Sequence, residues 1–140
     1  MPERFSYTSN VDGFAITAYH WPVAAPRAAM VIAHGAAEHA LRYERFAGAL
    51  NGAGIDAWAM DHRGHGASPG PEGLGDFGAG GWDALVADIG QLVAIVHRER
   101  PGVPIVLFGH SMGAAAVQQF APDGSRDIDA LILSGSTARG

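Results

Sequence analysis

The stretch PIVLFGHSMGAAAVQQFA, residues 104–121, decides the fold of this chain. Its first five residues form a continuous apolar run, which is typical of a strand buried on both faces of a sheet. A glycine-flanked turn, residues 109–113, follows directly, and the alanine-rich residues 114–121 favour a short helix. A buried strand that passes through a tight turn into a helix is the repeating unit of parallel α/β sheets.

The segments before and after this stretch repeat the alternation of strand and helix. Apolar residues at helical spacing, ended by Gly or Pro, predict helices over residues 41–51 and 82–100. Strands are predicted at residues 5–7, 14–21, 28–33, 55–60 and 128–133. The first two flank Asp12-Gly13, a hairpin signal, and the glycine-rich residues 61–81 are expected to form a loop. We therefore expect one α/β domain over residues 1–140, with a mostly parallel sheet, an N-terminal β-hairpin and helices on both faces.

Composition narrows the classes of function. The 140 residues are 48% hydrophobic, carry a net charge of −5 and contain no lysine and no cysteine. The absence of a basic stripe argues against nucleic-acid binding, and the absence of cysteine excludes disulfides, thiolate metal sites and a thiol nucleophile. Residues 1–10 lack a targeting pattern, and no apolar run approaches the ~20 residues that cross a bilayer. We expect a cytoplasmic protein with no transmembrane segment.

The turn in the first stretch carries a candidate nucleophile. Gly109-His110-Ser111-Met112-Gly113 is a G-x-S-x-G sequence between a predicted strand and a predicted helix. A serine that must stand exposed on a strained turn needs small residues two positions away on each side. The helix that follows directs its N-terminal N–H groups towards developing negative charge. The alternative interpretation is an ordinary turn between strand and helix.

A second candidate segment, His34-Gly35-Ala36-Ala37-Glu38-His39, follows the strand predicted at residues 28–33. In the functional interpretation, the backbone N–H groups of Ala36 and Met112 form an oxyanion hole. In the structural one, Glu38 lies in the first turn of a helix, where a negative charge is favourable. Side chains or backbone expected to frame the site belong to His34, Gly35, Gly109, His110 and Gly113.

Three segments together resemble a known family. HGAAEHALRY (34–43), DHRGHGAS (61–68) and GHSMG (109–113) are similar to the monoacylglycerol lipase and lysophospholipase group of α/β-hydrolases, also described as serine aminopeptidase-like hydrolases. The resemblance implies the N-terminal part of an α/β-hydrolase fold and a serine hydrolase without a cofactor. It implies small-molecule esters as substrates, such as acylglycerols or lysophospholipids. It also gives His34 a structural role and residues 61–68 a role in framing the site through hydrogen bonds.

Two members of a serine triad are missing from the sequence. In α/β-hydrolases the acid and then the histidine follow the nucleophile along the chain, yet the 29 residues after Ser111 contain no histidine. His110 adjoins the nucleophile, but on a tight turn its side chain should point away from the Ser111 hydroxyl. We expect a C-terminally truncated domain without the lid, acid and histidine, inactive by itself. A complementary C-terminal segment, or self-association through the edge of the last strand, would then be its partner.

Two other hypotheses stay open. A non-catalytic remnant would keep the fold without turnover. A metal-dependent hydrolase is less favoured, because the histidines at strand ends match no metal-binding pattern, and we expect no metal site. His20 and His97 are expected at the surface and Trp58 in the core, whereas Trp82 either lines an acyl pocket or joins the core.

Overall fold

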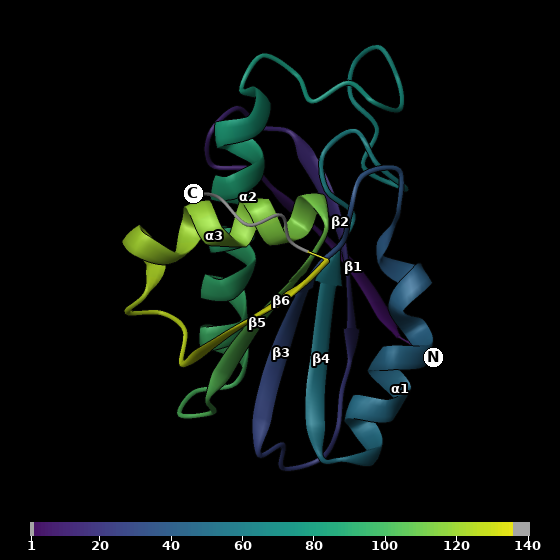
Figure 1. Cartoon of the computed structure of the whole chain (residues 1–140). Helices are drawn as coiled ribbons and strands as arrows, with labels where there is room; N and C mark the ends of the chain where they lie inside the picture. The colour runs from purple at the N-terminus through teal and green to yellow at the C-terminus, as the bar shows by residue number, and fades with distance from the viewer. Residues whose placement is uncertain (1, 136–140) are drawn as a thin grey trace.

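The computed structural model describes residues 2–135, whose strands form one mixed sheet in the order β1-β2-β4-β3-β5-β6 (Figure 1). β1 pairs antiparallel with β2, and β2 pairs antiparallel with β4, whereas β4, β3, β5 and β6 run parallel. The strands are β1 (Glu3–Thr8), β2 (Ala15–Trp21), β3 (Ala28–Ala33), β4 (Ile55–Met60), β5 (Ile105–His110) and β6 (Ala130–Ser134). The expected parallel sheet with an N-terminal hairpin is confirmed.

Helices cover both faces of the sheet, as the sequence predicts. A short 3-10 helix η1 (Ala40–Tyr43) and helix α1 (Glu44–Gly52) lie on one face, and helices α2 (Gly81–Glu99) and α3 (Met112–Gly124) lie on the other (Figure 1). Apolar residues of the strands divide between two buried clusters, one against α1 and one against α2 and α3. This burial on both faces explains why the central strands are continuous apolar runs rather than alternating ones.

The observed bounds of the elements match the predicted ones in the centre of the sheet and differ from them near the C-terminal end of the chain. Strands β3 and β4 have the predicted bounds. Helix α3 extends beyond the predicted residue 121 to Gly124, although Pro122 in its last turn lacks the N–H that an interior helical residue donates. β6 begins two residues later than predicted. Asp129, the residue before it, pairs with Ile105, whose backbone N–H donates to its carboxylate at 2.8 Å.

Two aromatic predictions and two histidine predictions can be compared with the structure. His97 is exposed, as expected. Trp58 is 2% exposed and lies in the core, as expected, and Trp82 packs half-buried against the same cluster. The surface position expected for His20 is wrong. Its ring is buried, stacks on Trp58 at 3.6 Å, and lies 2.7 Å from the buried carboxylate of Asp56. A polar partner 36 residues away along the chain makes that burial favourable.

The parallel arrangement gathers three loops at one edge of the sheet. The chain leaves β3, β4 and β5 at their carboxyl ends, so residues 34–39, residues 61–80 and the Ser111 turn meet there, near the top of Figure 1. This edge is where chemistry is concentrated in open α/β sheets.

At one edge of the sheet, strand β6 has exposed apolar side chains. Leu131, Ile132 and Leu133 are 37%, 43% and 41% exposed, although they belong to a strand with an apolar sequence. Among the described residues, no strand pairs with the outer edge of β6.

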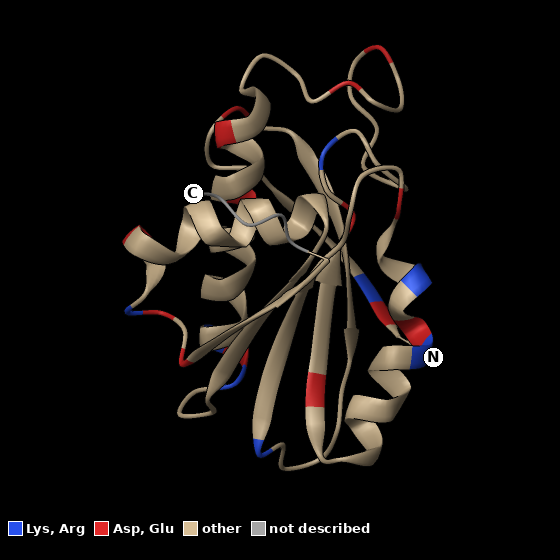
Figure 2. Ribbon diagram, in the orientation of Figure 1, with Lys and Arg blue, Asp and Glu red and all other residues tan. Residues whose placement is uncertain are grey.

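Within residues 2–135, arginines are scattered over the fold rather than gathered on one face (Figure 2). No helix of that range combines the length and the apolar character needed to cross a bilayer.

Candidate active site

Ser111 stands on a strained turn between β5 and α3. Its backbone has φ +57° and ψ −116°, a left-handed value of φ that non-glycine residues rarely adopt. Such a conformation costs about 1–3 kcal/mol and persists only where the surrounding structure enforces it. The Ser111 N–H donates to the carbonyl oxygen of Ser134 at 2.9 Å, while the residue itself is exposed. The fold thus presents the serine at the carboxyl end of the sheet.

Close backbone packing explains the two glycines of the turn. A Cβ atom on Gly113 would overlap the carbonyl oxygen of Ala33 and lie 2.7 Å from that of His34. A Cβ atom on Gly109 would lie 2.5 Å from the carbonyl oxygen of Gly113. The first turn of α3 therefore crosses the end of β3 at a distance that only glycine allows.

The segment after β3, residues 34–39, lies against the Ser111 turn, and we call it the β3–η1 loop. Gly35 is buried so close to Ser111 that an added Cβ would lie 3.1 Å from the serine Cβ. Ala36 and Ala37 are exposed, and Ala37 has φ +58°. The structure thus brings Gly35, the residue before Ala36, next to the serine turn that Met112 continues.

Glu38 does not lie in the first turn of a helix, where the structural interpretation of this segment placed it. It precedes η1, whose first turn contains no acidic residue, and its carboxylate turns back to accept the N–H of Gly35 at 2.7 Å. Sequence reasoning missed this contact because both a helix start and a backward hydrogen bond are compatible with the same short segment.

His34 is buried, and hydrogen bonds occupy both nitrogens of its ring. Nδ1 lies 2.7 Å from the carbonyl oxygen of Gly35, and Nε2 accepts the backbone N–H of His62 at 3.0 Å. The second bond requires a bare Nε2, so Nδ1 carries the proton and donates it. Burial lowers the pKa of His34 to about 4, which keeps the ring neutral. A ring committed in this way has no nitrogen free to act as a base for Ser111.

Five further histidines are also engaged elsewhere or lie far from the serine. Burial lowers the pKa of His62, whose Nε2 lies 3.1 Å from the carbonyl oxygen of His34. His110 Nδ1 lies 3.1 Å from the Ser134 hydroxyl, and its ring lines a groove of about 300 Å³ beside Phe108. His65 Nδ1 lies 3.1 Å from the carbonyl oxygen of Arg63. His20 and His97 have partners distant from the turn.

These histidines do not form a metal centre. The rings of His34, His62 and His65 cluster, with centroids 4.2 Å and 5.2 Å from that of His34. Each ring has at least one nitrogen on a backbone group, and in residues 2–135 no group of three His, Asp or Glu side chains could hold a metal ion.

Residues 61–68 frame the site through Asp61, as the resemblance implies. One oxygen of its carboxylate accepts the N–H of Ala40 at 2.7 Å, and the other accepts that of Ala67 at 2.9 Å. The start of η1 and the loop after β4 are therefore tied to a single buried side chain.

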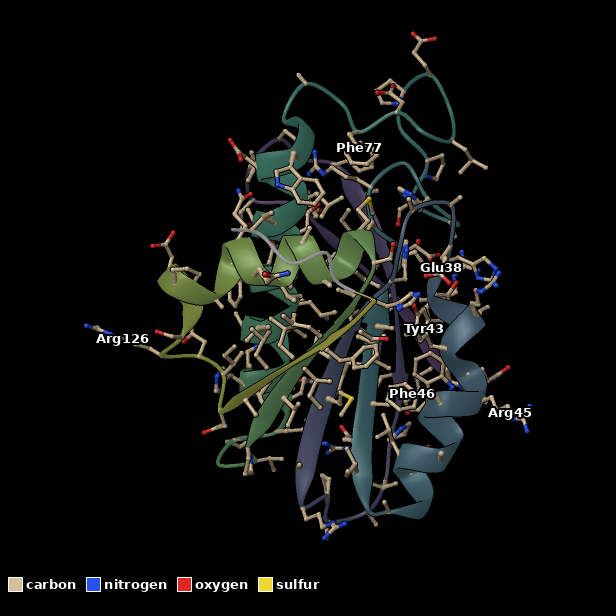
Figure 3. All side chains as sticks on the ribbon, viewed as in Figure 1. Glu38, Tyr43, Arg45, Phe46, Phe77 and Arg126 are labelled. Atoms are coloured by element: carbon tan, nitrogen blue, oxygen red, sulfur yellow. The ribbon has the colours of Figure 1, made fainter. Side chains whose placement is uncertain are left out.

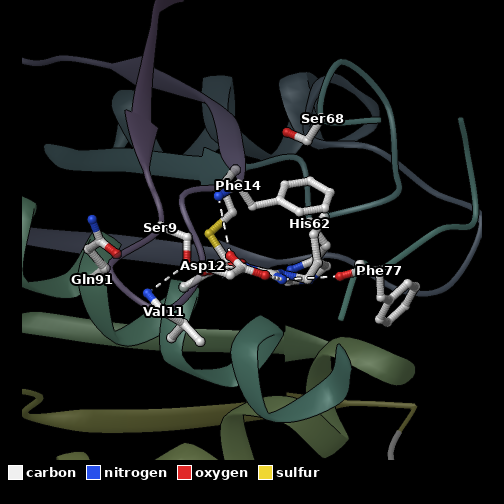
Figure 4. A network of polar contacts seen from close by, with 12 residues as sticks. Ser9, Val11, Asp12, Phe14, His62, Ser68, Phe77 and Gln91 are labelled. Carbon is white, nitrogen blue, oxygen red and sulfur yellow. Dashed lines mark hydrogen bonds and ion pairs between the residues drawn. The ribbon is translucent and has the colours of Figure 1, made fainter. Parts of the chain in front are cut away.

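A buried arginine, Arg63, forms a second set of contacts that connects distant segments, and the sequence did not predict it (Figure 4). The Arg63 guanidinium is fully buried and pairs with Asp88 of α2 at 2.8 Å and with Asp12 of the hairpin turn at 2.7 Å. It also donates to the carbonyl oxygen of Phe77 and lies over the ring of Phe14. The partners are 25 and 51 residues away, so no local pattern could identify them.

Similar proteins share this architecture. The chain is 37% identical over 129 residues to a monoacylglycerol lipase of Mycolicibacterium smegmatis, covering 91% of this chain and 44% of that protein. It is 39% identical over 108 residues to the human monoglyceride lipase, covering 76% of this chain and 34% of that protein. The crystal structure of a thermostable carboxyl esterase from Bacillus coagulans in complex with glycerol superimposes with a TM-score of 0.91 at 31% identity, covering 99% of this chain and 45% of that one.

The chain thus spans less than half the length of these relatives. A family model, that of serine aminopeptidase S33, matches residues 24–140, which include β3 to β6 and both loops of the site. Together with the strand order and the Ser111 turn, this match shows that the chain belongs to the serine aminopeptidase S33 family of α/β-hydrolases.

Proposed function

We propose that this chain supplies the nucleophile and the oxyanion hole of a hydrolase that cleaves carboxylic esters. The observation that carries the proposal is the left-handed backbone of Ser111 on a turn between strand and helix. A strained serine at this position is typical of an activated nucleophile, because the turn lifts the hydroxyl out of the backbone hydrogen bonds.

The reaction would proceed through an acyl-enzyme. The Ser111 oxygen attacks the ester carbonyl, and the backbone N–H groups of Ala36 and Met112 stabilise the oxyanion that forms. Expulsion of the alcohol leaves an ester on Ser111, which water then hydrolyses. In this proposal His34, Gly35, Gly109, His110 and Gly113 shape the site without taking part in proton transfer.

Proton transfer needs a base that this sequence does not offer. No histidine follows Ser111 in the sequence, and the rings of His34, His62, His65 and His110 are engaged as described. We therefore propose that the acid and the histidine of the triad come from a further polypeptide segment and that residues 1–140 alone are inactive.

The proposed substrates are monoacylglycerols or similar lipid esters, including lysophospholipids. Support comes from the relatives, which are described as monoacylglycerol and monoglyceride lipases, and from the glycerol in the Bacillus coagulans esterase structure.

Replacing the nucleophile tests the proposal. In a catalytically competent form of the protein, Ser111→Ala should lower kcat on a p-nitrophenyl ester by about 10⁶, since triad residues act as a unit. It should also abolish labelling by a fluorophosphonate. Ser125→Ala, at an exposed serine just beyond the far end of α3, is the matched control and should leave both unchanged. An alanine variant that keeps ordinary ester hydrolysis would refute the assignment.

The bare edge of β6 favours a second candidate function. A non-catalytic half-domain would pair with another strand through Leu131, Ile132 and Leu133, which are exposed at that edge. The two candidates differ in one measurement. When the partner segment is bound, Ser111 should react with a fluorophosphonate in the first case and stay unlabelled in the second.

A further inference from the structure

The β3–η1 loop, residues 34–39, has few apolar contacts of its own. Ala36 and Ala37 are exposed, and Ala37 holds a left-handed backbone conformation that is unfavourable for alanine. A loop with such a backbone keeps its shape only if hydrogen bonds enforce it. The direction of the Ala36 N–H therefore depends on what holds the neighbouring residue, Gly35.

Both backbone groups of Gly35 are held. Its N–H donates to Oε1 of Glu38 at 2.7 Å, and its carbonyl oxygen accepts from the ring of His34 at 2.7 Å and from the N–H of Glu38 at 3.3 Å. The Gly35 carbonyl and the Ala36 N–H belong to one planar trans peptide, so they point in opposite directions. Fixing the carbonyl towards His34 and Glu38 consequently fixes the Ala36 N–H on the other side.

Glu38 is itself anchored from two directions (Figure 3). The Tyr43 hydroxyl donates to its Oε1 at 2.9 Å, and Arg42 pairs with its Oε2 at 3.1 Å. The Tyr43 ring packs edge-on against Phe108 of β5, the strand that ends at the Ser111 turn. A continuous set of contacts thus links the strand below the nucleophile to the loop beside it.

The carboxylate also lies close to the reacting position. A Cβ atom on Gly35 would approach Glu38 Oε1 at 2.9 Å and the Ser111 Cβ at 3.1 Å, so all three residues are in one packed layer. Burial alone would raise the pKa of Glu38, but the hydrogen bonds from Gly35 and Tyr43 lower it. The group is therefore an anion at neutral pH, which makes its bond to the Gly35 N–H charge-assisted.

We propose that Glu38 is a positioning residue, which holds Gly35 through the N–H of the preceding peptide and thereby restrains the Gly35–Ala36 peptide, so that the Ala36 N–H faces the oxyanion formed on Ser111. This inference rests on the proposed function, because it assumes that Ser111 is the nucleophile and Ala36 a donor. A positioning residue of this kind acts in the transition state, so its loss should lower kcat more than it alters KM.

The kinetic test compares three variants of the catalytically competent protein. Glu38→Ala removes the acceptor and should lower kcat by about 10²-fold at nearly constant KM, as a donor displaced by about 1 Å does. Glu38→Gln keeps an oxygen for the Gly35 N–H and should restore most of the rate. Glu44→Ala, at an exposed glutamate of α1, is the matched control and should keep wild-type kcat.

A second measurement needs no catalysis. In residues 1–140, amide hydrogen exchange followed by NMR should show Gly35 protected in the wild type and in Glu38→Gln and fast in Glu38→Ala, with the β3 and β5 amides unchanged. Equal protection of Gly35 in Glu38→Ala, or a kcat within twofold of wild type, would overturn the inference. Failure of the proposed function is distinguishable, because only that failure leaves Ser111→Ala active.

Discussion

The absence of a side chain at Gly113 allows the Ser111 turn to pack closely against the backbone of Ala33 and His34. Gly113→Ala places a methyl group against the backbone of Ala33 and His34, atoms that belong to the sheet and cannot move aside. We expect this variant to lower the free energy of unfolding by about 3 kcal/mol or more, as severe overpacking does. Urea unfolding followed by circular dichroism measures it.

The matched control is Gly48→Ala in α1. A Cβ atom there meets nothing within 4 Å, and the position is exposed. Because alanine is favoured over glycine in a helix, this variant should be more stable by about 0.5–1 kcal/mol. Equal effects at the two positions would contradict the packing described for the Ser111 turn.

His34 makes stability depend on pH. Its pKa is about 4 in the folded protein, whereas an unfolded histidine titrates near ~6.5. As the pH falls below ~6.5, the unfolded chain binds a proton that the folded one refuses, so the free energy of unfolding decreases down to about pH 4 and then levels. His34→Gln should reduce the slope over this window by up to about 1.4 kcal/mol per pH unit. An unchanged slope in urea unfolding at several pH values would be evidence against a buried neutral ring.

At the scale of elements, Arg63 joins the hairpin, helix α2 and the loop after β4. Arg63→Met would leave the carboxylate of Asp88, only 1% exposed, without its cation. Breaking a buried ion pair in this way costs about 3–5 kcal/mol, and we expect the loop over residues 61–80 to be cleaved faster by a protease. Arg126→Met, at an exposed arginine remote from the site (Figure 3), should change stability by less than about 0.5 kcal/mol. Wild-type protease resistance in Arg63→Met would show that the loop is held by other contacts.

At the scale of the molecule, the edge of β6 should govern how residues 1–140 behave in isolation. An apolar strand with a free edge offers another chain unpaired N–H and C=O groups and apolar side chains that are exposed to solvent. We expect light scattering after gel filtration to show self-association that grows with protein concentration. Ile132→Lys should weaken it, because a charge at an edge opposes pairing.

Leu74→Lys provides the control for that experiment. Leu74 is 71% exposed, but it lies in the loop after β4 rather than at the sheet edge. The same charge there should leave association unchanged. A monomer at every concentration, or equal effects of the two lysines, would contradict pairing through β6.

The sequence by itself determined most of the elements and the strand–turn–helix at Ser111. Burial on both faces appears as a continuous apolar run, and β3 and β4 accordingly begin and end where predicted. The signal for the Ser111 turn is contained within five residues, because the constraint is a local backbone conformation with close packing on each side.

Only the tertiary structure decided how buried polar groups are paired. Arg63 finds Asp12 and Asp88, and His20 finds Asp56, across 25 to 51 residues of chain. Hydrophobic periodicity is a property of neighbouring residues, whereas the partner of a buried charge is whichever group the fold brings within about 3 Å of it. For that reason the sequence predicted where the site lies, and the folded chain alone showed what holds its loops in place.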